Sequence, residues 1–142
     1  GRSDDVINIS GHRISTSEIE NVCLDVDLIK EACAVGASDA LTGEKIILYL
    51  TPSTRIFEKA PIFKKIKQII ENKLSKYHLP SRIEIFNELP KTQSGKIMRR
   101  IMRDLAENNQ FNEKLDYSTL ANKENFLRSK ELFLSSKKIN NY

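Results

Sequence analysis

Two short apolar runs, "EACAVGAS" at residues 31–38 and "KIILYLTPS" at residues 45–53, most constrain the fold of this chain. Each run is bounded by turn residues, with "DALTGE" between them. Apolar runs of this length favour buried strands over helices, because helices usually need ten or more periodic residues. A third run, "RIEIF" at residues 82–86, predicts a further strand.

The first twenty-three residues predict a hairpin followed by a helix. In "VINISGHRI", residues 6–9 and 12–14 are expected to be extended and joined by a tight turn at Ser10 and Gly11. Glycine tolerates the positive φ that such a turn often needs. Ser15 and Glu18 then fit the capping-box pattern S-x-x-E, which indicates a helix start.

Two more helices follow from apolar spacing. Within residues 60–80, apolar side chains recur every three or four positions, which predicts a helix. Pro61 fits the first turn of this helix, and Pro80 lies beyond its end. After Lys96 a second stripe is formed by Ile97, Met98, Ile101, Met102 and Leu105, and the arginines at 99, 100 and 103 are expected to point elsewhere.

Strands mixed with helices predict an α+β fold. We expect a small domain with a short N-terminal β-hairpin and a small, about three-stranded mixed sheet flanked by helices. This domain is predicted to span residues 1–107. Residues 108–142 are polar and rich in Lys and Asn, so we expect a peripheral tail that is partly helical near 123–134.

The composition and the cysteines indicate the kind of cellular environment that suits this chain. No run of about 18 apolar residues is present, so no membrane span is predicted. Cys23 and Cys33 lie in apolar runs without a CxxC pattern, which favours buried free thiols over a bridge and fits a reducing cytoplasm. The chain does not begin with Met, so a piece of a longer protein is expected.

Charge is distributed unevenly along the chain. Residues 1–55 carry 5 Lys and Arg against 9 Asp and Glu, whereas residues 56–110 carry 12 against 6. The middle of the chain is therefore expected to face an anion. Nucleic acid, a phosphate-bearing small molecule and an acidic protein surface all satisfy that expectation.

The segment "LPKTQSGKIMRR", residues 89–100, places Lys96 between small polar residues and a basic helix. A P-loop is excluded, because Pro90 stands where its first Gly is needed and Ile97 where Ser or Thr is needed. What remains is a compact charge on a flexible stem, suited to an anion delivered from elsewhere. Taken alone, a solvated lysine before a helix is the simpler interpretation.

The other candidate sites are weaker. Arg99, Arg100 and Arg103 are suited to phosphate or RNA, but no aromatic residue is interleaved with them for base stacking, which favours a solvated helix face. Asp4 and Asp5 make a poor metal site without further ligands, and the two histidines lie too far apart to suggest a zinc site.

Taken together, "GRSDDVINISGHRISTSEIE" and "LPKTQSGKIMRRIMRDLA" resemble the two hallmark motifs of the C-terminal domain of adenylate-forming enzymes. These enzymes include acyl-CoA synthetases, luciferases and peptide-synthetase adenylation domains. The forms "NISGHRI" and "DYSTLANKE" most resemble AMP-forming acetyl-CoA synthetases. The resemblance implies a two-step reaction in which Mg²⁺-ATP and a carboxylate give an acyl-adenylate, whose AMP is then displaced by the thiol of CoA.

The resemblance also implies roles for individual residues. Lys96 matches the lysine inserted beside the carboxylate and the α-phosphate during adenylation. Arg2 and Arg13 match arginines that contact ATP, and Asp4 matches the hinge of a rotating domain. Ser10 and Gly11 match the turn that lines the CoA passage.

Further partners and departures follow from the same resemblance. A large N-terminal adenylation domain, absent from this chain, is expected to hold most of the acetate, ATP and Mg²⁺ sites, and no metal ligand is assigned here. Where relatives place an arginine for the CoA phosphates, this chain has Glu71, so Lys73 or Lys76 is the expected substitute. A protein acetyltransferase and a deacetylase acting on Lys96 are also implied.

Two alternatives remain open from the sequence. The same domain would suit a synthetase for propionate or another short acid, because the acyl pocket is expected in the missing domain. A stand-alone basic module that binds nucleic acid is the alternative from a different class.

Overall fold

The computed structural model describes residues 6–56, 58–108, 110–111 and 116–140, with side chains as far as Lys137. The elements, in chain order, are β1 (Val6–Ile9), β2 (His12–Ser15), α1 (Thr16–Cys23), β3 (Ile29–Asp39), β4 (Gly43–Pro52), α2 (Ala60–Lys73), the 3₁₀ helix η2 (Lys76–His78), β5 (Arg82–Ile85), α3 (Arg99–Asn108) and α4 (Lys123–Asn140).

The strands form one mixed sheet of five strands, and β3 and β4 are its longest pair. These two strands run antiparallel, while β5 pairs in parallel with β4. The β1–β2 hairpin joins the sheet through the pairing of Ile9 with Gly43. The predicted α+β class, the N-terminal hairpin and the mixed sheet are confirmed. The hairpin belongs to the sheet, which therefore has more strands than expected.

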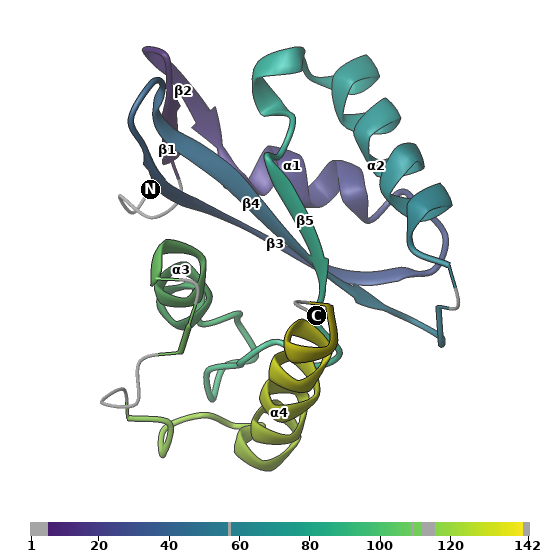
Figure 1. Cartoon of the computed structure of the whole chain (residues 1–142), viewed down its shortest axis with the longest axis vertical. Coiled ribbons are helices and arrows are strands. Elements are labelled where there is room, and N and C mark those ends of the chain that lie inside the picture. Colours follow the sequence, from purple (N-terminus) through teal and green to yellow (C-terminus); the bar gives the residue numbers. More distant parts are fainter. Residues whose placement is uncertain (1–5, 57, 109, 112–115, 141–142) are drawn as a thin grey trace.

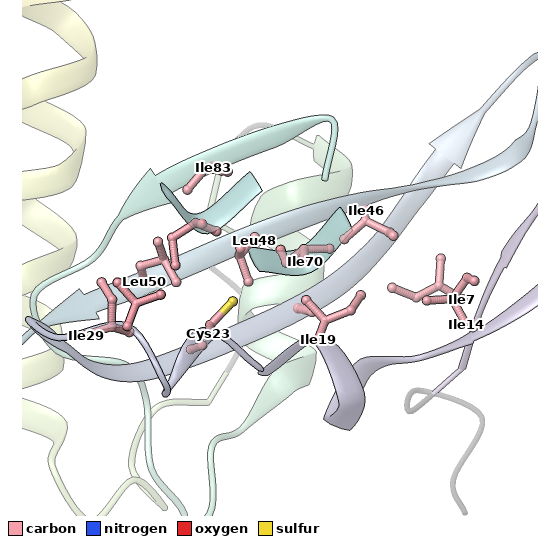
Figure 2. Packing of buried hydrophobic residues seen from close by; sticks show 14 residues of the cluster. Ile7, Ile14, Ile19, Cys23, Ile29, Ile46, Leu48, Leu50, Ile70 and Ile83 are labelled. Carbon is pink, nitrogen blue, oxygen red and sulfur yellow. The ribbon is translucent and has the colours of Figure 1, made fainter. Parts of the chain in front are cut away.

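Both faces of the sheet are covered, which explains why β3 and β4 read as continuous apolar runs. Helices α1 and α2 lie on one face and α3 and α4 on the other (Figure 1). Successive residues of β4 alternate between two hydrophobic cores: Ile46, Leu48 and Leu50 face the first, while Ile47 and Tyr49 face the second. Figure 2 shows the first core, in which Cys23 and Ile70 from the two helices meet the strands.

The second core includes the C-terminal segment. Phe126 of α4 is completely buried, and its ring centroid lies 5.8 Å from that of Phe86. Phe111 and Leu120 are buried in the same core. The helix expected near 123–134 lies within the longer α4, which contributes the buried Phe126 to this core while its Leu132 is 54% exposed. The boundary at residue 107 stays a prediction.

Two local details differ from the sequence predictions. Helix α1 begins where the capping pattern places it, but the Ser15 hydroxyl meets the Ser17 hydroxyl at 2.9 Å and makes no cap hydrogen bond. Helix α3 begins at Arg99, so Ile97 precedes it and pairs as an antiparallel bridge with Lys91. Within the part of the chain that the structure describes, no helix is long and apolar enough to cross a membrane.

The two cysteines are buried free thiols, as predicted. Burial, reinforced by the nearby Glu20 charge, raises the pKa of each thiol to about 12. A raised pKa keeps the group as the neutral thiol up to well above pH 8, and only the thiolate attacks disulfide reagents.

We therefore expect both thiols to resist an aromatic disulfide reagent at pH 8 and to react fully in guanidinium chloride. Rapid labelling of either cysteine in the folded chain would contradict this burial.

Candidate functional site

Lys96 closes a three-residue hairpin loop. The Thr92 carbonyl accepts the Gly95 N–H at 2.9 Å, and the Thr92 N–H donates to the Lys96 carbonyl at 2.7 Å. Gly95 has a φ of +85°, and the Lys96 N–H donates to the Thr92 hydroxyl at 3.1 Å. A turn ended by a glycine with positive φ is a common three-residue hairpin connection. Gly95 is therefore needed for its backbone conformation.

Hydrogen bonds hold the backbone on both sides of the turn. The backbone around Lys96 is held by its own hydrogen bonds, and the Met98 N–H donates to the Pro90 carbonyl at 2.8 Å below the turn. The Lys96 side chain is exposed. A hydrogen-bonded turn therefore carries an exposed lysine side chain.

Arg99, three residues after Lys96, anchors this hairpin to the sheet. Its guanidinium makes a bidentate contact with the Glu20 carboxylate of α1 and donates to the Ala34 carbonyl of β3 at 3.2 Å. Glu20 also accepts the Ala34 N–H at 2.8 Å. The pair thus satisfies the backbone groups at the edge of β3 and joins α1, β3 and α3.

The Glu20–Arg99 pair was missed from the sequence, and it overturns part of a prediction. Arg99 is only 22% exposed at its side chain, so it does not belong to a solvated basic face. The sequence offered only one usable signal, a glutamate on the core-facing stripe of α1 beside Ile19. A charge at such a position requires a partner, but nothing in the spacing identified Arg99 as that partner.

A second ion pair anchors the start of the hairpin. Lys91 pairs with Glu31 of β3, and each side chain is 20% exposed. The hairpin is therefore tied to β3 before the turn by Lys91 and after it by Arg99.

The β1–β2 turn forms a second candidate site. Ser10 and Gly11 have φ values of +49° and +86°, the pattern of a type I′ turn. The Ser10 N–H donates to the Thr42 carbonyl at 2.8 Å, which fixes this turn against the β3–β4 turn. A Cβ added to Gly11 would meet nothing within 4 Å, so the space beside it is open. Arg13 is exposed on β2, opposite Asn8.

An aromatic pair lies next to this turn. The rings of His12 and Tyr77 stack with centroids 4.0 Å apart, and the Lys76 ammonium lies 5.5 Å from the centroid of Tyr77. Lys73 instead pairs with Asp25 at 3.0 Å. The structure thus places Lys76 near the turn and engages Lys73 elsewhere.

The structure separates these two groups of residues. Ser10, Gly11 and Arg13 share the β1–β2 hairpin, whereas the segment that leads from β5 into α3 lies at the other end of the molecule, beside the start of α4 (Figure 1). Arg2 and Asp4 lie outside the described residues. Among the described residues, no cluster of three or more His, Cys, Asp or Glu could hold a metal ion.

A solved structure and a family model relate this small α+β unit to known proteins. An acyl-CoA synthetase from Brucella canis has this fold, with a TM-score of 0.68 and 32% identity over 73% of this chain and 19% of that chain. The family model described as AMP-binding enzyme C-terminal domain matches residues 18–96, more than half of the chain, and the chain belongs to this family.

Individual relatives refine the comparison. The chain is 43% identical over 122 residues to an acetyl-coenzyme A synthetase from Pseudoalteromonas translucida, covering 85% of this chain and 19% of that protein. An acetyl-coenzyme A synthetase from Streptomyces coelicolor is 40% identical over 121 residues, covering 85% of this chain and 18% of that protein. The chain therefore spans about a fifth of the length of these relatives.

The anchor at Arg99 yields a stability prediction. Glu20→Gln removes the carboxylate that pairs with the part-buried Arg99 guanidinium, and breaking one side of a buried pair costs up to about 3 kcal/mol. We expect a loss of that size in the free energy of unfolding, measured in urea. The matched control is Asp25→Asn, which breaks the exposed Lys73–Asp25 pair and should cost less than about 1 kcal/mol. Equal losses in the two variants would show that Glu20 is not an anchor.

Proposed function

We propose that the chain is the mobile C-terminal domain of an acetyl-CoA synthetase, which forms acetyl-CoA from acetate, ATP and CoA and releases AMP and pyrophosphate. The observation that carries this proposal is the Lys96 hairpin, an ordered turn that presents an exposed ammonium group. Family membership and the relatives named acetyl-coenzyme A synthetase support it. The chain alone is inactive, and its partner is its own N-terminal adenylation domain.

In the first step, a carboxylate oxygen attacks the α-phosphorus of ATP and pyrophosphate leaves. Negative charge accumulates where the carboxylate and the phosphate meet, and the Lys96 ammonium enters this region as a positioned countercharge. Such a preorganised group is typically worth about 2.7–4 kcal/mol of the barrier. The hairpin limits the cost of placing it, because its backbone is already hydrogen bonded. Arg2 and Arg13 contact the nucleotide, which stays bound as the AMP moiety of the acyl-adenylate, so Arg13 on the β1–β2 hairpin can act in the second step.

In the second step, the CoA sulfur attacks the acyl carbon and AMP leaves. The Lys96 cation must then withdraw, and the domain turns about Asp4 to present the β1–β2 turn. Ser10 and Gly11 line the passage of the pantetheine arm, where the open space at Gly11 permits close approach. The separation of the turn from the hairpin suits a domain that serves one step with each end.

The CoA phosphates require a cation that Glu71 does not supply. We assign this role to Lys76, because the stacked His12 and Tyr77 rings connect it to the glycine turn. Lys73 is less suited, since it already pairs with Asp25.

The remaining proposals concern the metal ion, the location of the protein and the alternatives to acetate. Mg²⁺ would accompany ATP in the N-terminal domain and help to neutralise its phosphates. A cytoplasmic location is consistent with two buried free thiols. Propionate or another short acid would use the same domain in the same way. No observation favours the nucleic-acid module, because Arg99, one of its three candidate arginines, is committed to Glu20.

Two substitutions in the complete protein test the division of labour. Lys96→Ala should lower adenylate formation, measured as acid-dependent exchange of pyrophosphate into ATP, by roughly 100- to 1,000-fold. It should largely spare thioester formation from supplied acyl-adenylate. Gly11→Leu should do the reverse by obstructing the CoA passage.

Matched controls isolate these effects. Lys67→Ala removes an exposed lysine from α2 and should leave both steps intact. Gly11→Ala imposes the same backbone strain as Gly11→Leu with a small side chain, so it separates strain from obstruction. Equal damage to both steps by Lys96→Ala and by Gly11→Leu would refute two separate catalytic ends.

A regulatory hypothesis follows from the exposure of Lys96. Acetylation by a protein acetyltransferase would remove the charge and stop adenylation, and a deacetylase would restore it. The expected result is loss of pyrophosphate exchange in enzyme acetylated at Lys96, with thioester formation retained. Full exchange activity in the acetylated enzyme would refute this regulation.

A further inference from the structure

The segment Thr119–Asn122, just before α4, contacts the Lys96 hairpin. The Ala121 N–H donates to the Lys91 carbonyl at 3.0 Å, and the Gln93 side-chain amide donates to the Thr119 carbonyl at 3.1 Å. One contact lies at the base of the hairpin and the other at its turn. Residues 119–122 themselves lie outside residues 18–96, the region that matches the family model.

The side chain of Asn122 makes the densest of these contacts. Its Oδ1 accepts the Lys91 N–H at 2.9 Å, while its Nδ2 donates to the Leu89 carbonyl at 2.7 Å and to the Glu88 carboxylate at 2.6 Å. An amide has one acceptor oxygen and two N–H donors, so each of its polar atoms is used here. A single side chain thus fixes the strand that enters the hairpin.

Helix α4 holds Asn122 in place. The Phe126 N–H donates to the Asn122 carbonyl at 2.9 Å in the first turn of the helix, and Phe126 is completely buried in the second core. Leu120, two residues before Asn122, is 4% exposed and belongs to the same core. The segment is therefore anchored on both sides of the residues that touch the hairpin.

We propose that residues 119–122 brace the Lys96 hairpin and that Asn122 is a positioning residue for the adenylation step. This inference rests on the proposed function for its catalytic part. The ion pairs of Lys91 and Arg99 tie the hairpin to β3 and α1, whereas Asn122 ties it to α4 through backbone groups. Asn122 touches no reacting atom; it acts by fixing where the Lys96 ammonium starts from.

The test compares Asn122→Ala with Asn108→Ala in the complete protein. Asn108 is a matched control, because its exposed side chain makes one hydrogen bond, to the Asp104 carbonyl in its own helix. Amide hydrogen exchange should accelerate at residues 91–98 in Asn122→Ala and stay unchanged in the control. Pyrophosphate exchange should fall by up to roughly 100-fold, because small misplacements of a catalytic group are costly. Thioester formation from supplied acyl-adenylate should be retained.

The other possible outcomes each contradict one part of the proposal. Unchanged hydrogen exchange at residues 91–98 in Asn122→Ala would overturn the brace. Faster hydrogen exchange with full pyrophosphate exchange would overturn the positioning role, and so would an equal loss of both steps together with a lower melting temperature. A parent protein that shows no acid-dependent reaction would refute the proposed function instead, and hydrogen exchange would still decide the brace.

Discussion

The buried pair of Glu20 and Arg99 is the interaction on which the rest of the structure depends. β3 is the last strand of the sheet, and a strand edge leaves backbone groups that need partners. Glu20 and Arg99 bond the N–H and the carbonyl of Ala34. The pair thereby joins α1, α3 and the Lys96 hairpin to β3. The same contact that protects the sheet edge therefore also positions the candidate catalytic lysine.

The two hydrophobic cores explain how one small unit can present two separate ends. Alternate residues of β3 and β4 enter opposite cores, so the sheet transmits a fixed geometry to both of its faces. The first core holds α1 and α2, near the β1–β2 turn. The second holds α3 and α4, between which the Lys96 hairpin is attached (Figure 1). A unit with two cores on one sheet fits the proposed turning of the domain, which would exchange one end for the other.

Local patterns in the sequence predicted the elements well and their long-range contacts poorly. Short apolar runs gave β3, β4 and β5, and apolar spacing gave α2, because these signals depend on neighbouring residues. The partners of Glu20 and Asn122 lie 79 and about 31 residues away along the chain, so no periodicity reports them. The burial of Phe126 was likewise hidden, since a sparse apolar segment contributes to a core only when the tertiary fold brings the Phe86 ring beside it. The exposed Lys96 and Gly11 were found through their motifs.

The central claim is that an ordered hairpin, and not a flexible loop, carries the Lys96 ammonium. Backbone ¹⁵N relaxation of residues 92–97 tests it most directly, with β3 as the internal reference. The account predicts order parameters near those of rigid backbone, about 0.85, with motion confined to the lysine side chain. Order parameters below about 0.6 in the turn, with rigid values in β3, would contradict it.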